Sequence, residues 1–177
     1  MKVKVILIAA LTLISLRGFA QLTLERGYEL VQQGKIPESI AVFEQIAVKQ
    51  PRNSEVYNAL SQLYYRQSKY KQAYDAADKG LAISVKDDNL SISKAKAANN
   101  LGKFDEAIAL MDACIARDAA FFLPYAVKAN AYDGQNKLQL AIGLYSKSIQ
   151  LDPEYARNYL DRGSDFASLS RYDQAIA

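Results

Sequence analysis

Small and large apolar positions recur along this chain with a period of 34 residues. Large, mostly apolar side chains keep that spacing at Ile36, Tyr70, Phe104, Leu138 and Tyr172. Three residues further along, each copy has a small residue, namely Ser39, Ala73, Ala107, Ala141 and Ala175. A second small series runs through Gly27, Ser61, Ala95, Ala129 and Gly163. Because no insertion or deletion breaks this spacing between residues 20 and 177, the sequence predicts a tandem array of one structural unit.

Each unit contains two stretches with helical periodicity. In the third copy, Ala95 and Ala98 lie on one face of a first helix, and residues 107–115 keep the three-and-four rhythm of a second. Gly102 falls in the turn between them. Pro51 falls between two units, where a helix has to stop. The pattern therefore predicts pairs of helices joined by a short turn.

A 34-residue unit in which small and large positions alternate in this way resembles the tetratricopeptide repeat (TPR). The resemblance implies an all-α fold, an α-solenoid of tandem helix-turn-helix units whose two helices are antiparallel. The predicted units comprise residues 20–53, 54–87, 88–121, 122–155 and, in part, 156–177. The small residues then mark where the two helices of a unit cross most closely, since a larger side chain would force the backbones apart.

The last predicted unit stops early, at "RYDQAIA" (residues 171–177), which is the start of its second helix. Repeat arrays require a terminal unit with a polar outer face. Phe166, Leu169, Tyr172 and Ile176 have too little chain after them to be covered. We therefore expect the sequence to be a fragment of a longer chain, the alternative being a naturally short and frayed end. An uncapped last unit would also allow self-association.

The first twenty residues differ from the repeats. A basic start (residues 1–4) precedes an apolar run of about twelve residues (5–16), and Gly18-Phe19-Ala20 gives a small-x-small ending. The run is shorter than the roughly 20 residues that a membrane-spanning helix needs. We interpret residues 1–20 as a bacterial secretory signal peptide, cut between Ala20 and Gln21. The TPR domain (21–177) would then be periplasmic or secreted without an integral membrane span; an uncleaved amino-terminal anchor is the alternative.

Removing the predicted signal changes the charge balance. The chain has 22 basic and 19 acidic residues, and subtracting Lys2, Lys4 and Arg17 leaves 19 of each sign. A neutral mature chain lacks the positive charge that usually accompanies nucleic-acid binding. The charge therefore argues against a nucleic-acid partner.

The chain lacks the residue types on which common catalytic sites depend. It contains no histidine, which excludes histidine-dependent triads and the usual Cys/His zinc sites. Cys114 is the only cysteine, so no intramolecular disulfide can form, and its place in a helical repeat predicts a buried, unreactive thiol. The sequence also has no glycine-rich phosphate loop. We therefore expect a protein that is not an enzyme and that has no cofactor or metal.

The TPR resemblance implies that the first helices line a concave groove for an extended peptide or a partner's helix. Many positions predicted to face this groove carry amides, which donate and accept hydrogen bonds and so suit a peptide backbone. The alternative is that these polar side chains only solvate an exposed face. We also expect Leu123, Val127 and Leu160 to be exposed apolar contacts. The candidate groove residues are Asn58, Gln62, Tyr65, Asn89, Lys96, Asn99, Asn100, Leu123, Asn130 and Asp133.

A basic series precedes the second series of small residues. It comprises Arg26, Lys94, Lys128 and Arg162, and Leu60 interrupts it. We expect the aliphatic stems to cover the helix pairs while the charged tips pair with carboxylates such as Asp118 or Asp152. An anion-binding ladder is the alternative.

These observations favour a non-enzymatic scaffold of the cell envelope that binds a protein or peptide partner in its concave groove. The alternative is a structural or oligomerising spacer in a longer exported protein whose activity lies in a missing carboxy-terminal part. The repeat specifies a shape that serves many tasks, so the sequence does not identify the partner.

Overall fold

The structure is a computed structural model that describes residues 22–170 of the 177-residue chain. The predicted signal peptide (1–20) and the predicted second helix of the last unit (171–177) lie outside the described residues. All secondary structure between residues 22 and 170 is helical, so the predicted all-α fold is confirmed. The helices are α2 (Leu24–Gln32), α3 (Ile36–Lys49), α4 (Ser54–Arg66), α5 (Tyr70–Ile83), α6 (Asp88–Asn100), α7 (Phe104–Arg117), α8 (Phe122–Gly134), α9 (Leu138–Leu151) and α10 (Arg157–Ser168).

The 34-residue period sets where the helices begin. The second helices α3, α5, α7 and α9 are each 14 residues long and begin at Ile36, Tyr70, Phe104 and Leu138. The first helices α4, α6 and α8 begin at the predicted unit starts, Ser54, Asp88 and Phe122. Helix α10 begins at Arg157, one residue later than this spacing gives.

The turn inside each helix pair is built in the same way every time. One residue adopts the left-handed conformation, with φ of 72° at Gly34 and Gly102, 58° at Ser68 and Asn136, and 60° at Ser170. In the first four turns, the backbone N–H of the following lysine donates to the carbonyl five residues earlier, at 2.8–2.9 Å. This is the Schellman arrangement, which satisfies carbonyls that the end of a helix leaves without partners. A Cβ at Gly34 or Gly102 would meet nothing within 4 Å, so serine or asparagine also fits this turn sterically.

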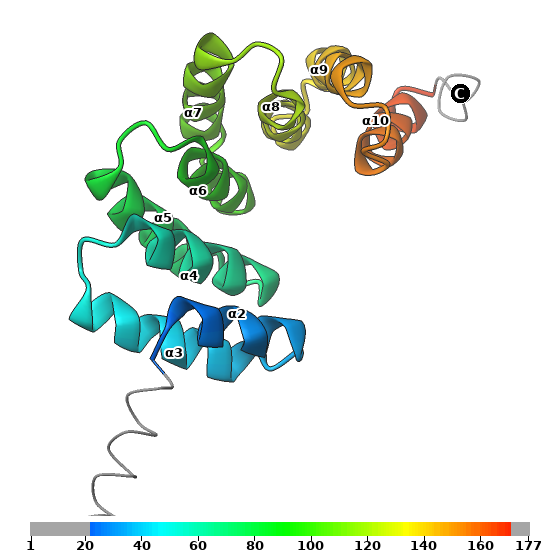
Figure 1. Ribbon diagram of the computed structural model, residues 1–177. Coiled ribbons are helices and arrows are strands. Elements are labelled where there is room, and N and C mark those ends of the chain that lie inside the picture. The colour runs from blue at the N-terminus through cyan, green and yellow to red at the C-terminus, as the bar shows by residue number, and fades with distance from the viewer. Residues whose placement is uncertain (1–21, 171–177) are drawn as a thin grey trace, which may run out of the picture.

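The helix pairs stack into a curved array (Figure 1). Each helix packs on the next one along the chain, and α6 also contacts α4 and α8. Helices α4, α6, α8 and α10 lie along the inner side of the curve, while α5, α7 and α9 lie along its outer side. No helix within residues 22–170 is both long enough and apolar enough to cross a membrane.

The small residues of the repeat lie where the helices of a pair cross. Ser39, Ala73, Ala107 and Ala141 are all fully buried. The Ser39 hydroxyl donates to the Gly27 carbonyl at 2.9 Å, and the Ser61 hydroxyl donates to the Ala73 carbonyl at 2.8 Å. These bonds join a side chain of one helix directly to the backbone of the other, so little room remains between the two helices.

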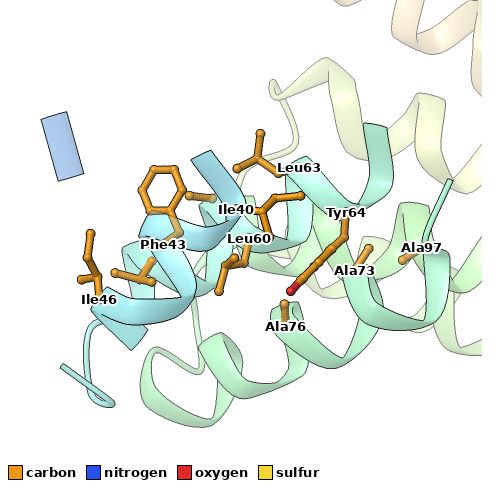
Figure 2. Close-up of a cluster of buried hydrophobic side chains, with 11 residues drawn as sticks. Ile40, Phe43, Ile46, Leu60, Leu63, Tyr64, Ala73, Ala76 and Ala97 are labelled. Carbon is orange, nitrogen blue, oxygen red and sulfur yellow. The ribbon is translucent and has the colours of Figure 1, made fainter. Parts of the chain in front are cut away.

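Large side chains fill the space beside these crossings. Phe43 and Ile46 of α3 pack with Leu60, Leu63 and Tyr64 of α4 in the largest buried cluster (Figure 2). A second cluster in the next units contains Met111 and Cys114 of α7, both fully buried. The predicted burial of Cys114 is thus confirmed, and burial raises the pKa of its thiol to about 11.

Candidate functional site

Two adjoining pockets follow the inner helices. The first groove pocket, of about 310 Å³, lies between α4 and α6 and reaches Leu123 of α8. The second groove pocket, of about 330 Å³, extends from α6 across α8 to α10. Tyr65 and Lys96 line both pockets, so the two form one continuous groove.

Nearly all of the candidate groove residues line these pockets. The first pocket contains Gln62, Tyr65, Asn89, Lys96 and Leu123, and the second adds Asn99, Asn100, Asn130 and Asp133. Asn58 lines neither pocket. Its side-chain oxygen accepts hydrogen bonds from Gln62 and from Ser93 of α6. The structure therefore brings these residues to one face, and peptide binding by them stays a prediction.

The charge of the first groove pocket is positive. Arg66 and Lys96 line it, and none of the acidic residues between 22 and 170 does. The Lys96 ammonium forms no ion pair with any residue between 22 and 170, and burial of the side chain lowers its pKa. A half-buried cation without a counter-ion favours an anionic ligand group at this place.

Several groove amides are engaged within the fold. The Asn99 amide donates to the carbonyl of Val127 at 3.0 Å, which ties α6 to α8. The Asn130 amide donates to the buried hydroxyl of Tyr145 on α9. Each of these two amides therefore uses one N–H group within the fold and keeps one for a ligand, whereas the sequence pattern led us to expect both to be available. The Asn99 side-chain oxygen remains buried without a hydrogen-bond partner among the described residues.

The far end of the groove carries an acidic group. Asp133 of α8 and Asp161 of α10 line the second pocket, and Arg157 donates to Asp161 at 2.8 Å. Asp165, only 3% exposed, lies against Asp133. Burial, followed by the nearby charges of Asp133 and Asp161, raises the pKa of Asp165 to about 7. Asp165 is therefore a buried carboxyl that gains a proton near neutral pH.

Asp165 was not among the candidate residues predicted from the sequence, although comparison of the repeat units indicates that it is buried. The equivalent positions in the three preceding units are Leu63, Ala97 and Ala131, and all of them are buried. An acid at a position that is otherwise small or apolar indicates a buried carboxyl. The repeat pattern thus points to the position, while its partner Asp133 is evident only from the packing of α8 and α10.

Comparison with known proteins identifies the family. A family model described as anaphase-promoting complex, cyclosome, subunit 3 matches residues 32–114, and one described as tetratricopeptide repeat matches residues 92–156. The chain is a tetratricopeptide-repeat protein. A search of curated proteins finds no match.

Solved structures resemble this TPR protein over most of their length. MamA (41 to the end) from Desulfovibrio magneticus RS-1 is 19% identical with a TM-score of 0.73, covering 86% of each chain. TTC0263, described as a thermophilic TPR protein in Thermus thermophilus, is 13% identical with a TM-score of 0.75, covering 86% of this chain and 84% of that one. YrrB, described as a TPR protein with an unusual peptide-binding site, is 14% identical with a TM-score of 0.65, covering 86% and 79%. At these identities, the similarity shows the fold.

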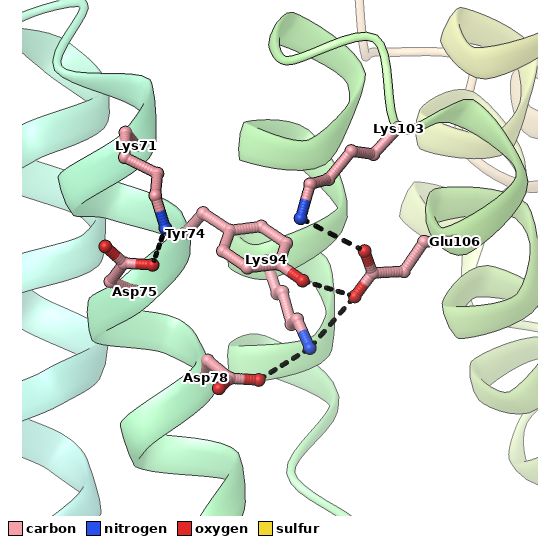
Figure 3. A network of polar contacts seen from close by, with 7 residues as sticks. All are labelled: Lys71, Tyr74, Asp75, Asp78, Lys94, Lys103 and Glu106. Atoms are coloured by element: carbon pink, nitrogen blue, oxygen red, sulfur yellow. Dashed lines mark hydrogen bonds and ion pairs between the residues drawn. The ribbon is translucent and has the colours of Figure 1, made fainter.

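The basic series of the TPR units pairs differently from the prediction. Lys94 binds Asp78 at 2.7 Å and Glu106 at 3.0 Å, beside the ring of Tyr74 (Figure 3). Lys128 binds Asp112 of the preceding outer helix. The predicted pairing with carboxylates is confirmed for Lys94 and Lys128. The two named partners were wrong, because the Asp118 and Asp152 carboxylates accept backbone N–H groups in their own turns.

The prediction that three apolar side chains are exposed is confirmed for Leu160 and wrong for Val127. Val127 is only 1% exposed, because it packs in the cluster around Met111. Leu123 is half-buried at the edge of the first groove pocket, and Leu160 of α10 is 71% exposed. Within the described part of this TPR protein, no group of three or more His, Cys, Asp or Glu side chains has an arrangement that could hold a metal ion.

Proposed function

We propose that this TPR protein is a non-enzymatic scaffold that binds an extended segment of a partner protein along α4, α6, α8 and α10. The observation that carries this proposal is Lys96, a half-buried cation on the groove wall that has no counter-ion among the described residues. Lys96 lies where the two groove pockets meet, so a segment that follows the groove passes over it. The partner segment therefore presents an acidic side chain to Lys96 and Arg66.

The opposite charge at the far end favours one orientation of the ligand. Asp133 and Asp161 line the second pocket with Arg157, which pairs with Asp161, so Asp133 is the acid without an ion pair among the described residues. Arg66 lines only the first pocket. A segment with an acidic residue over α4 and α6 and a basic residue over α8 and α10 matches this charge distribution. Such complementarity favours one register and suppresses the reversed one, because like charges would then face each other.

The groove is tested with two labelled peptides, acetyl-Ala-Ala-Glu-Ala-Ala-amide and its glutamine counterpart. They differ only in that the carboxylate of the first is an uncharged amide in the second. Fluorescence anisotropy is expected to show tighter binding of the glutamate peptide. Lys96→Met should weaken that binding about tenfold, the size of a charge-assisted hydrogen bond. The matched control is Lys147→Met on α9, an exposed lysine outside both groove pockets. Equal binding of the two peptides, or equal effects of the two variants, would contradict an anion-binding groove.

We further propose that the protein works outside the cytoplasm, in the periplasm or beyond the cell. This part rests on the arrangement of residues 1–20, in which a basic start precedes an apolar run and a small-residue ending. In its host, the protein from the envelope fraction is expected to begin at Gln21 when its amino terminus is determined by mass spectrometry. An uncut chain that begins at Met1 in the cytoplasmic fraction would contradict this location.

A further inference from the structure

The basic series provides a template for a cation site between successive units. In Figure 3, the Lys94 ammonium lies between Asp78 of α5 and Glu106 of α7, and its side chain is only 13% exposed. Its stem runs along the helix-pair core, and its ammonium lies 4.9 Å from the centroid of the Tyr74 ring. The site therefore accommodates a nearly buried lysine with carboxylate partners on both sides.

The same geometry recurs one unit further along the chain. Lys128 binds Asp112, and both this pair and Lys94–Asp78 span 16 residues. Arg162 also reaches the residue 16 positions earlier, Ser146, at 3.3 Å. The cations of α6, α8 and α10 thus bond to the preceding outer helix at a fixed offset.

The second unit keeps the carboxylate but lacks the cation. Leu60 replaces the lysine, and the residue 16 positions before it is Glu44 of α3. The carboxylate of Glu44 accepts a hydrogen bond from the hydroxyl of Tyr64. Burial, followed by this hydrogen bond, raises the pKa of Tyr64 far above its usual value, so the hydroxyl keeps its proton and donates it to Glu44.

A pocket opens where the missing lysine would lie. It has a volume of about 440 Å³ and is lined by Glu44 and Val48 of α3, Leu60 and Tyr64 of α4, and Gln72 of α5. Figure 2 shows Leu60 and Tyr64 next to each other on this side of α4, with Ala76 of α5 near the hydroxyl. We call this space the α3–α5 pocket. In the described part of the chain, the residues that line it differ from those that line the two groove pockets.

We propose that the α3–α5 pocket binds a lysine side chain of a partner protein, whose ammonium takes the place that Lys94 and Lys128 occupy in the later units. Glu44 accepts from the ammonium, as Asp78 does from Lys94. The methylene groups of the incoming lysine lie against Leu60 and Ala76. This site is separate from the groove and does not depend on the proposed function of the groove.

None of the ion pairs among residues 22–170 joins a cation of the protein itself to Glu44. Asp75, on the wall of the pocket, is already bound to Lys71. Lys79 also lines the pocket and forms no ion pair with Glu44 or with any other residue between 22 and 170. Val48, at the edge, is 82% exposed, which supplies an apolar surface for the chain that carries the lysine. Charge, shape and apolar edge together match a lysine on a protein surface.

The test uses the peptide acetyl-Gly-Lys-Gly-amide and a counterpart in which norleucine replaces lysine. Titration into the isotope-labelled protein is expected to shift backbone amide signals of α3 and α5 with the lysine peptide, whereas the norleucine peptide leaves them in place. Reading the signals by position separates this pocket from the acidic group around Asp133. Glu44→Gln should weaken the binding about fivefold, the size of an exposed ion pair. Glu38→Gln, which removes one exposed charge from the same helix outside the pocket, should not.

A second pair of variants tests whether a lysine at position 60 would fill the α3–α5 pocket. Leu60→Lys should occupy the pocket with the protein's own ammonium and abolish the shifts, whereas Leu60→Met should keep them. If Leu60→Lys does not fold, the proposal is tested by the lysine-peptide binding of Glu44→Gln compared with that of Glu38→Gln. Equal shifts with the two peptides, unchanged binding by Glu44→Gln, or unchanged binding by a folded Leu60→Lys would overturn the proposal.

Discussion

Replacing Asp165 with asparagine is expected to stabilise the protein at pH 8 and to remove a pH dependence that the parent shows between about pH 4 and 7. Burial and the neighbouring acids raise the pKa of Asp165 in the folded state to about 7. The folded protein therefore binds this proton more tightly than the unfolded chain does. Stability is highest when Asp165 is protonated, and it falls as the pH rises from the usual aspartate value through the folded pKa.

The groups around Asp165 determine the size of this effect. Asp133 on α8 and Asp161 on α10 repel its charge, and the hydroxyl of Tyr145 on α9 lies in the same cluster of titratable groups. Arg157 is occupied by Asp161. An asparagine cannot ionise, so Asp165→Asn should raise the free energy of unfolding at pH 8 by up to about 4 kcal/mol.

Thermal unfolding at pH 8 and pH 5 checks this expectation. The gain from Asp165→Asn should be large at pH 8 and small at pH 5, where the parent carboxyl is protonated. Glu154→Gln removes one exposed charge just before α10 and should leave the pH dependence of the parent unchanged. A variant that is no more stable than the parent at pH 8 would show that Asp165 carries no buried charge.

Replacing Ala107 with phenylalanine is expected to lower the free energy of unfolding by about 1–3 kcal/mol, the usual cost of overpacking a core. Ala107 is completely buried where α6 and α7 cross, in the cluster with Met111 and Cys114. The hydroxyls of Ser39 and Ser61, at related crossings, bond directly to backbone carbonyls of the opposite helix. A ring has no room there unless the helices separate.

Denaturant or thermal unfolding measures this loss. The control is Ala109→Phe, which places the same ring on an exposed position of α7 and should change stability little. If the two variants unfold alike, Ala107 does not lie at a close crossing. Hydrogen exchange should further show that the damage spreads to α6 and α8, because each helix packs on its neighbours in the chain.

The repeat period predicted much of this molecule. It gave the all-α architecture and the position at which each second helix begins, since equivalent residues occupy equivalent places in every unit. Nine of the ten groove residues that the TPR resemblance implied line the two adjoining pockets. The period was informative because each unit buries the same face against its neighbour.

The period could not predict which side chains meet between helices. Lys94 reaches Asp78, 16 residues away, while Asn99 reaches Val127, 28 residues away, and neither separation follows from a repeat of 34. Such contacts depend on the rotation of one helix against the next. Leu60 and Asp165 depart from the residue type found at the equivalent positions of other units, which the sequence alone shows. What these departures do became clear only from the packing around Glu44 and Asp133.

The turn inside every unit contains one left-handed residue, from Gly34 to Ser170. This regularity affects how the gene of a repeat protein can gain or lose units. Consecutive turns lie 34 codons apart and adopt nearly the same backbone geometry. Unequal recombination between two of them would remove or duplicate one whole unit and rejoin the chain within a turn that already fits. Serine, asparagine and glycine all serve at this position, so the junction imposes little demand on the sequence. The reach of the groove could thus evolve in whole units, while each remaining unit keeps its shape.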